Sequence, residues 1–282
     1  MQFRGGGPRR DDLIARVYFG AFVLALFVAM TQLGGAEASA PTRRHAAPRP
    51  AVASTTSLAT APPPTAPVAA QTTAPPSAAL ALGPDLEHRL PAPTVDGHPA
   101  VVLTFDDGPH PFFTPRVLDV LNSRGIKAVF CVVGTEIARY PHLVARIAAE
   151  GHALCNHSEN HDTRMSRKDP HYVAAMMRNP SNLIRDITGK PPAFYRGPGG
   201  DLSVFIIEEA HRLGMRILGW SVDPADYFKP GADAIQNRVV GGMHPGAIVL
   251  LHDAGGERTQ TVEQLAGLID RLRGAGYTFV LP

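Results

Sequence analysis

Short apolar runs alternate with amphipathic segments along residues 99–282, and this alternation restricts the possible folds more than any other feature of the sequence. Runs rich in Val, Ile, Leu and Phe are typical of buried strands. The pattern predicts strands over residues 100–105, 126–133, 152–156, 193–196, 216–221, 247–251 and 277–281. It predicts helices over 114–125, 141–150, 204–213, 232–240 and 261–273, and one that starts at Asp169 and is interrupted by Pro180. Such alternation predicts a parallel sheet, either open and doubly wound or closed into a barrel.

The first third of the chain differs in composition and precedes a single globular domain that we place at residues 94–282. Residues 1–16 contain four arginines, and residues 17–33 are uncharged and mostly apolar. This pattern is typical of an export signal, predicted over residues 1–38 with cleavage after Ala38. Alternatively, residues 13–33 stay in the bilayer as an N-terminal anchor. Both alternatives predict a domain outside the cytoplasm, either secreted, periplasmic or tethered to the membrane.

Residues 39–93 are dominated by Ala, Pro, Thr and Ser. Such a segment buries too little apolar surface to offset the entropy that it would lose on ordering. We therefore predict a disordered linker that spaces the domain from the export segment.

The charge and the cysteine content narrow the possible partners and scaffolds. The formal net charge is only +2, and Lys and Arg do not cluster beyond the N-terminal segment, so nucleic acid is not an expected partner. Cys131 and Cys155 are too few for a disulfide scaffold and lack the paired spacing of a zinc-thiolate site. They fall in successive predicted strands, and because a disulfide requires a particular approach of the two Cβ atoms, we predict two free thiols.

Polar residues follow the C-terminal ends of five predicted strands, at the edge where both parallel-sheet architectures build active sites. They are Asp106 with Asp107, His157, Arg196, Asp223 and His252. The sequence predicts that most of them share one site. Asp223 is instead expected to cap the turn or helix that comes after it, and Trp220 is expected to lie in the core.

His157 and His161 lie four residues apart, so one turn or tight loop can direct both at a metal ion. The pair alone is weak evidence because the chain has 12 histidines. With Asp107 as a third ligand, the pair would leave an open position for water, as in catalytic zinc sites. A metal in such a site lowers the pKa of water toward roughly 7. Asp106 is then placed to act as the base and His252 as the acid.

Five motifs in chain order make residues 99–282 resemble the polysaccharide deacetylase family, the carbohydrate esterases built on a NodB homology domain. The motifs are Thr104-Phe105-Asp106-Asp107-Gly108, His157-Ser-x-x-His161, Arg196-x-Pro198-x-Gly200, Asp223-x-x-Asp226-Tyr227 and Leu250-x-His252. The resemblance implies an α/β fold, a distorted and incomplete (β/α) barrel of about seven parallel strands.

The resemblance also implies roles for individual residues. Asp107, His157 and His161 are implied as ligands of a divalent metal, with zinc first and Co, Ni, Mn or Fe as alternatives. Asp106 is implied as a base held by Arg196, His252 as an acid tuned by Asp226, and the backbone N–H of Gly199 as an oxyanion donor. Two positions depart from the family pattern: Gly199 stands where Tyr is common, and Tyr227 stands where Trp is common. These departures affect the expected substrate preference and leave the catalytic set complete.

The implied activity is metal-dependent removal of N-acetyl groups from glycans that contain N-acetylglucosamine, of the peptidoglycan or chitin type, by a monomer. Two alternatives stay open. One is hydrolysis of a small amide or imide by the same chemistry, which an export signal disfavours. The other is a cell-wall glycan-binding protein without catalysis, which the complete catalytic set disfavours.

Overall fold

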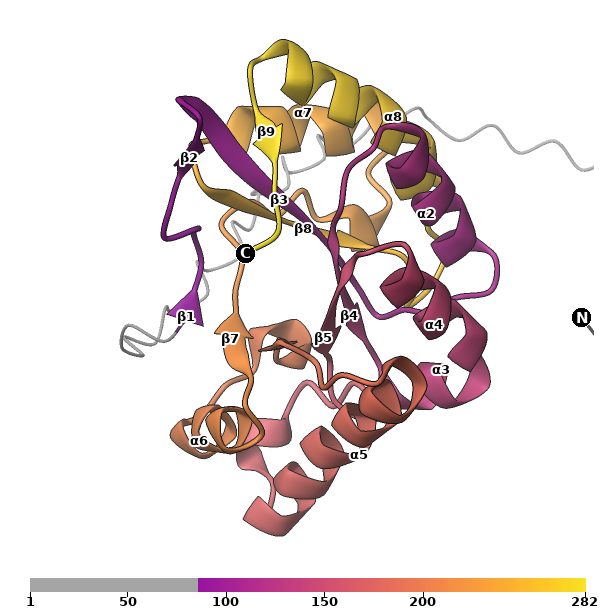
Figure 1. Cartoon of the computed structure of the whole chain (residues 1–282), viewed down its shortest axis with the longest axis vertical. Coiled ribbons are helices and arrows are strands. Elements are labelled where there is room, and N and C mark those ends of the chain that lie inside the picture. Colours follow the sequence, from indigo (N-terminus) through magenta and orange to yellow (C-terminus); the bar gives the residue numbers. More distant parts are fainter. Residues whose placement is uncertain (1–85) are drawn as a thin grey trace, which may run out of the picture. The chain divides into compact units, whose positions relative to one another are not determined.

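Nine strands form one curled sheet in residues 86–282, the part of the chain that the computed structural model describes (Figure 1). Six parallel strands follow one another across it: β7 (Arg216–Leu218), β6 (Phe194–Tyr195), β5 (Ala153–Asn156), β4 (Val129–Val132), β3 (His98–Asp106) and β8 (Ala247–His252). Around them, β1 (Leu86–Glu87) pairs with β7 and β9 (Thr278–Phe279) pairs with β3, both in parallel, whereas β2 (Thr94–Val95) is antiparallel to β3.

The sheet curls into an incomplete barrel, as the resemblance implied. The segment after β7 reaches β8, where Val222 and Val249 form a parallel bridge. The backbone N–H of Leu250 donates to the carbonyl of Val222 at 2.9 Å. This short contact brings the two ends of the sheet together, so the open doubly wound alternative is excluded.

The helices lie along the outside of the curled sheet (Figure 1). They are α2 (Phe113–Ser123), α3 (Gly134–Arg139), α4 (Pro141–Ala149), α5 (Pro170–Thr188), α6 (Val204–Arg212), α7 (Ala232–Gly242) and α8 (Thr259–Gly274). Three 3₁₀ turns join them: η1 (Met165–Arg167), η2 (Pro198–Gly200) and η3 (Asp226–Phe228). The short helix α3 has no counterpart among the predicted elements.

The central strand β3 shows how the sheet positions the site. Its residues from Ala100 to Asp106 are all buried, as expected where helices cover one face of a sheet and a barrel interior fills the other. Val101, Leu103 and Phe105 belong to the large core beneath the helices, whereas Ala100 and Val102 belong to the interior cluster. Because side chains alternate along a strand, Asp106 continues the interior row and emerges at the barrel mouth.

Helix α5 runs from Pro170 to Thr188 without a break, so the predicted interruption at Pro180 is wrong. Proline removes one backbone donor from a helix and normally bends or ends it. Here the neighbouring carbonyl of Met177 accepts hydrogen bonds from Asn156 Nδ2 at 2.6 Å and from Ser181 Oγ at 3.0 Å. Side-chain donors and burial of Pro180 therefore hold the helix together where the sequence alone predicts a break.

The structure describes residues 86–93, which belong to the predicted disordered linker, and shows them paired and packed. Strand β1 pairs with the edge strand β7, and Leu90 is buried in the interior cluster. The pairing satisfies backbone groups that β7 would otherwise expose, so a few apolar residues suffice to order this segment. The predicted signal or anchor and most of the predicted linker lie outside the described residues. No helix within residues 86–282 is long and apolar enough to cross a membrane.

The two cysteines form a disulfide, so the prediction of free thiols is wrong. Cys131 and Cys155 are direct partners in the register of the parallel strands β4 and β5, and their Cα atoms are 4.2 Å apart. The prediction of free thiols used only the fact that the two strands are neighbours, because their register is not visible in the sequence. The register places the two cysteines opposite each other, with both side chains inside the barrel.

Candidate active site

Three predicted metal ligands meet at the barrel mouth. Asp107 follows β3, whereas His157 and His161 lie in the loop after β5, and one ligand atom from each lies within 4.8 Å of the others. Asp107 Oδ1 is 3.1 Å from His161 Nε2 and 3.5 Å from His157 Nε2. Burial would raise the pKa of Asp107, but the hydrogen bonds and charges of the two histidines outweigh it and hold this pKa far below its usual range. We call these three residues the ligand triad.

The ligand triad fits a divalent metal ion. Asp107 Oδ1 is buried and has no well-aligned hydrogen-bond partner. Buried polar atoms are normally paired, so this oxygen is available to bind a cation. His157 directs its other ring nitrogen, Nδ1, to the carbonyl of Arg196 at 2.8 Å, so Nε2 is left to face Asp107. A backbone carbonyl in this position commonly orients a histidine that binds metal. Two imidazoles and one carboxylate also leave positions free for water and substrate.

The turn that carries the histidines is held by Asn156, which sequence reasoning missed. Its side-chain oxygen accepts the backbone N–H of Ser158 at 2.8 Å, and its amide nitrogen donates to the carbonyl of Met177 on α5. Ser158 and His161 both have positive φ, of 62° and 56°. Backbone in this region is unfavourable for residues other than glycine and persists where the surroundings fix it, often at functional sites.

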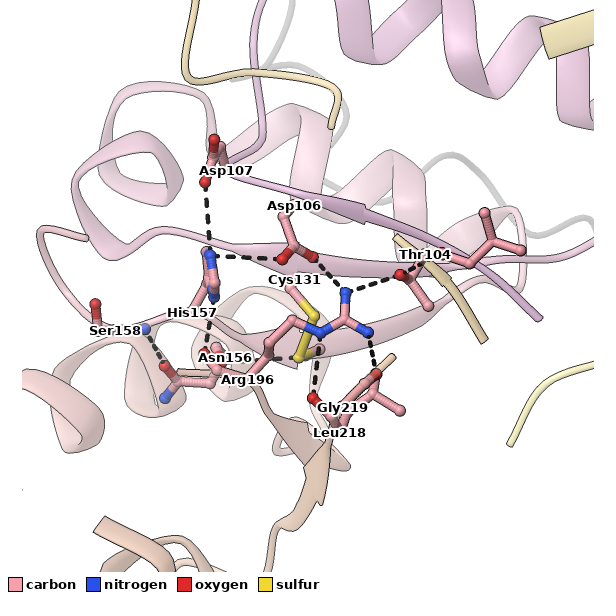
Figure 2. Close-up of a disulfide and its surroundings, with 12 residues drawn as sticks. Thr104, Asp106, Asp107, Cys131, Asn156, His157, Ser158, Arg196, Leu218 and Gly219 are labelled. Atoms are coloured by element: carbon pink, nitrogen blue, oxygen red, sulfur yellow. Dashed lines mark hydrogen bonds and ion pairs between the residues drawn. A yellow bond between two sulfur atoms is a disulfide. The ribbon is translucent and has the colours of Figure 1, made fainter. Parts of the chain in front are cut away.

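Arg196 holds Asp106 from below, as the resemblance implied (Figure 2). Its Nη1 donates to Asp106 Oδ1 at 2.7 Å and to Thr104 Oγ1 at 2.8 Å. Its Nε and Nη2 donate to the carbonyls of Leu218 and Gly219. Arg196 is 1% exposed and Asp106 is 3% exposed. The two charges are therefore paired inside the protein, where a fixed hydrogen-bond geometry is required to offset their desolvation.

The free oxygen of Asp106 faces the ligand triad. Asp106 Oδ2 lies 3.6 Å from His157 Nε2, on the opposite side of the carboxylate from Arg196 (Figure 2). Oδ1 is thus paired with the guanidinium of Arg196, and Oδ2 is directed toward the place where a water molecule bound at the ligand triad would lie. This arrangement suits a base whose orientation is already set. The Cys131–Cys155 disulfide lies beside this group inside the barrel, because Cys131 is the register partner of Asp106.

His252 and Asp226 form the opposite side of the mouth. His252 Nδ1 is 2.6 Å from Asp226 Oδ1, and Asp226 Oδ2 accepts the backbone N–H of His252 and the hydroxyl of Thr261. Burial lowers the pKa of His252, but the hydrogen bond and charge of Asp226, with the charges of Asp106 and Asp107, raise it by more. The net pKa is above its usual value, which suits an acid that must hold a proton near neutral pH.

Asp106, His252 and the ligand triad line one cavity of about 360 Å³. Gly199 and Tyr227 lie on its wall as predicted. Trp220 and Asp223, which follow the end of β7, also line it. Trp220 packs in part against the interior cluster, as expected of a core residue, but it also faces the cavity. Asp223 does accept the backbone N–H two residues later at 2.7 Å, so the predicted capping role and the position in the cavity coexist. Arg258 is a further wall residue without a predicted role.

The loop after β8 supports the ligand triad from behind. Gly255 has φ of 68°, and a Cβ added there would overlap Asp107 Oδ2. Arg258 is buried and holds this loop, since its guanidinium donates to the carbonyls of Ala254, Gly255 and Glu257 at 2.7, 3.0 and 2.9 Å. The carboxylate of Asp107 therefore packs against a glycine, and the fixed conformation of the loop places that glycine there.

Asp253 connects the same loop to the segment after β3. Thr114 Oγ1 donates to Asp253 Oδ2 at 2.5 Å, and a Cβ at Gly108 would lie 2.6 Å from Asp253 Oδ1. Burial raises the pKa of Asp253 to about 7. The Asp-Gly pair that ends β3 thus packs tightly against the loop after β8, a contact that no local motif predicts.

Comparison with known proteins identifies the family. The profile of the polysaccharide deacetylase family matches residues 95–218. A chitooligosaccharide deacetylase of Bradyrhizobium sp. (strain ANU 289) is 40% identical over 195 residues, which cover 65% of this chain and 89% of that protein. A peptidoglycan-N-acetylglucosamine deacetylase of Bacillus cereus is 36% identical over 64% of this chain and 84% of its own length. The crystal structure of the Bc1960 peptidoglycan N-acetylglucosamine deacetylase covers 64% of this chain and 85% of its own, with a TM-score of 0.62 and 34% identity. This chain belongs to the polysaccharide deacetylase family.

Proposed function

We propose that this protein is a metal-dependent hydrolase that removes N-acetyl groups from glycans containing N-acetylglucosamine, of the peptidoglycan or chitin type. The observation that carries the proposal is the placement of Asp106, which is held by Arg196 on one oxygen and faces the ligand triad with the other. The relatives named above support the substrate class, since they act on chitooligosaccharides and peptidoglycan. Zinc is the proposed metal because two imidazoles and one carboxylate suit it.

The proposed reaction adds water to the acetamide and yields acetate and a free amine. A metal bound by Asp107, His157 and His161 would supply polarisation of the acetamide carbonyl and a lower pKa for water. Asp106 takes a proton from the attacking water through Oδ2, while Arg196 keeps the carboxylate ionised and oriented.

The remaining residues complete the proton and charge balance. The backbone N–H of Gly199, on the cavity wall, donates to the oxygen that becomes negative in the tetrahedral intermediate. His252 delivers a proton from Nε2 to the departing nitrogen, because Asp226 occupies Nδ1. The products are the neutral amine and acetic acid, which ionises to acetate. The proton that Asp106 took from water returns to solvent and replaces the one that His252 delivered to the amine.

The disulfide supports a location outside the cytoplasm. Structural disulfides form and persist mainly in oxidising compartments, and the Cys131–Cys155 pair is buried beside the candidate site. An exported domain, either released by cleavage or anchored through residues 13–33, would meet cell-wall glycans directly. Fractionation of the expressed full-length chain, with N-terminal sequencing of the mature form, tests both parts of this proposal.

Two variants of adjacent residues test the mechanism. Asp107→Ala removes a proposed ligand, so metal content and acetate release should fall together. Asp106→Asn removes the base and leaves the ligand triad intact, so it should keep its metal while turnover falls by about 10²–10⁴-fold. Asp119→Asn, an exposed aspartate on α2, serves as the matched control and should change neither. Metal content by atomic emission and acetyl loss by mass spectrometry are measured on each protein.

The substrate panel separates the alternatives. It contains chitooligosaccharides, peptidoglycan fragments, acetylated xylan and a cyclic imide. Loss of acetyl groups from the first two alone supports the proposal, whereas turnover of the imide alone identifies a small-amide hydrolase. A metal-loaded protein that binds glycans and turns over none of the four is a binding protein. If Asp106→Asn loses its metal and Asp107→Ala keeps it, the assigned roles are reversed.

A further inference from the structure

Residues 86–90 connect the two strands at which the curled sheet closes. The first two of them form β1, which pairs in parallel with β7 (Figure 1). Further along, Arg89 forms a bridge with Ala247 of β8. The backbone N–H of Leu90 also donates to the carbonyl of Gly246 at 2.9 Å. We call residues 86–90 the strap, because one short segment joins β7 to β8.

The strap fixes the backbone that follows β7. The carbonyl of Glu87 accepts the N–H of Gly219 at 2.8 Å, and His88 Nδ1 lies 3.0 Å from the carbonyl oxygen of Trp220. A carbonyl oxygen only accepts, so Nδ1 carries the proton and donates it. A Cβ added to Gly219 would lie 2.5 Å from this Nδ1. Two consecutive residues of the strap thus contact two consecutive residues after β7 closely.

The same backbone segment, residues 218–220, holds Arg196. The carbonyls of Leu218 and Gly219 accept from its Nε and Nη2 at 3.2 and 2.8 Å (Figure 2). The ring of Trp220 lies 5.7 Å from the guanidinium carbon. The remaining nitrogen, Nη1, donates to Asp106 Oδ1 at 2.7 Å. A continuous set of contacts therefore runs from the strap through residues 218–220 and Arg196 to Asp106.

We propose that His88 is a positioning residue for the reaction. Together with Glu87 it fixes residues 218–220, which fix the guanidinium of Arg196 and so the orientation of the Asp106 carboxylate. The strap precedes residues 95–218, which match the family profile, so this role lies outside the matched motifs. The inference rests on the function proposed above and adds a residue that acts through the backbone and without contact with the substrate.

Substitutions of His88 test this role. His88→Ala removes the donor to Trp220, whereas His88→Asn keeps a side-chain N–H close to the position of Nδ1. His98→Ala is the matched control, because His98 is exposed at the start of β3. We expect His88→Ala to lower kcat about threefold to tenfold, the effect of one net hydrogen bond, with KM and metal content unchanged. His88→Asn should restore most of kcat, and His98→Ala should leave it unchanged.

Gly219→Ala separates the strap from the backbone without removing a residue of the strap. The new Cβ overlaps His88 Nδ1, so the ring and the backbone must move apart. Gly241→Ala is the matched control, because a Cβ added there has no atom within 4 Å and neither glycine has a positive φ. Gly219→Ala should lower kcat about tenfold, and Gly241→Ala should not lower it. Both changes at the strap act on one contact, so adding His88→Ala to Gly219→Ala should cost little more.

An Asp106→Asn background separates positioning from a general structural role. If His88 acts through the base, His88→Ala should leave the residual turnover of Asp106→Asn unchanged. A general structural role would lower turnover by the same factor in both backgrounds. That result, or an increase in KM at constant kcat, would overturn the inference.

Hydrogen exchange at Arg196 Nε gives a readout that needs no turnover. This N–H donates to the carbonyl of Leu218, and its signal in ¹⁵N spectra is assigned by through-bond correlation. We expect exchange about threefold to tenfold faster in His88→Ala and in Gly219→Ala, and unchanged in the two controls. Unchanged exchange in both strap variants would also overturn the inference.

The two proposals fail in different ways. Faster exchange at Arg196 in a protein that releases no acetate from any substrate of the panel contradicts the proposed function and leaves the hold of the strap on Arg196. Acetate release that depends on neither His88 nor Gly219 contradicts the positioning role and leaves the proposed function.

Discussion

The two walls of the candidate site differ in how many contacts fix their side chains. On the buried wall, Asp106 and Arg196 are almost fully enclosed, and the guanidinium donates to four separate oxygens. On the exposed wall, Gly199 and Tyr227 lie in the 3₁₀ turns η2 and η3, open to solvent. Buried charges need complete sets of partners, so a change on the first wall disturbs many contacts. A change on the second wall disturbs few.

This difference explains where the chain departs from the family pattern. Both unusual residues, Gly199 and Tyr227, are on the exposed wall, where a side chain makes few contacts with the rest of the protein. The buried wall keeps every residue that the family motifs require. Differences in substrate preference between this protein and its relatives should therefore arise on the exposed wall, and variants of the two walls, set beside controls far from both, can test this.

The largest effect is expected for Arg196→Ala. The substitution leaves Asp106 as a buried unpaired carboxylate and removes the donors to Thr104, Leu218 and Gly219, so stability should fall by about 3–5 kcal/mol. Turnover should be lost even where the variant is folded. Arg185→Ala is the control, because Arg185 is half exposed and pairs only with its neighbour, and it should cost about 0–1 kcal/mol. Urea unfolding of both variants measures the contrast, and equal losses would show that the buried wall is not specially fixed.

Gly255→Ala should produce the next largest effect, on metal binding. The new Cβ would displace Asp107 Oδ2, and changes in groups that orient a ligand typically weaken metal affinity by about 10–100-fold. Gly125→Ala is the matched control, because Gly125 has φ of 60° and a Cβ added there would have no atom within 4 Å. Both variants carry the strain of a positive φ, of about 1–2 kcal/mol. Only Gly255→Ala should lose metal in a chelator titration, and similar affinities in both would refute the role of the loop.

The buried wall was largely predictable from sequence, because its residues follow strand ends and form spaced motifs. Asp106, His157, Arg196 and His252 each come directly after or at the end of a strand, and parallel strands bring these ends to one edge. The alternation of elements likewise predicted six of the helices and seven of the parallel strands, but neither β1 nor β2. What sequence could not supply was register. Cys131 and Cys155 pair because β4 and β5 align at these two positions, and nothing in either strand alone specifies that alignment.

Contacts between loops that are distant along the chain also could not be predicted from the sequence. Gly255 touches Asp107 only because the loops after β8 and β3 meet, and Arg258 fixes that meeting through backbone carbonyls that carry no side-chain signature. For Pro180 the sequence predicted a break that does not occur. Helix α5 continues through Pro180 because this residue is buried and because Asn156, at the end of β5, donates to the helix carbonyl of Met177. Local preferences were correct where local forces dominate, and tertiary contacts decided the other cases.

Asp226→Asn should shift a pH profile with a moderate change in rate. The charge and hydrogen bond of Asp226 raise the pKa of His252, so a neutral Asn lowers it. Because the proposed role of His252 requires its protonated form, activity is lost as pH rises through that pKa. The basic limb of kcat/KM should therefore move to lower pH in Asp226→Asn. Asp223 lines the same cavity but hydrogen-bonds to Ala225 and Tyr227, so Asp223→Asn should leave the basic limb of kcat/KM unchanged. If the basic limb of kcat/KM has the same pKa in both variants as in the unsubstituted protein, His252 is not the acid.

The smallest effect is expected for Tyr227→Trp on the exposed wall. The Tyr227 ring is 39% exposed, and its hydroxyl makes one long hydrogen bond, of 3.4 Å, to Asp223 Oδ2. A tryptophan keeps the aromatic wall beside His252 and costs only that bond, so stability should change by less than about 0.5 kcal/mol, the usual range for surface positions. The overall rate should stay within about threefold, because a change of about 0.5 kcal/mol in activation free energy is well below the 1.4 kcal/mol that corresponds to a factor of ten.

The ratio of rates between chitooligosaccharides and peptidoglycan fragments should change, because the indole of Tyr227→Trp covers more of the groove. Competition assays with both substrates in one mixture measure this ratio directly. A large loss of stability would place Tyr227 with the buried wall, and an unchanged ratio beside an unchanged rate would show that this wall does not select the substrate.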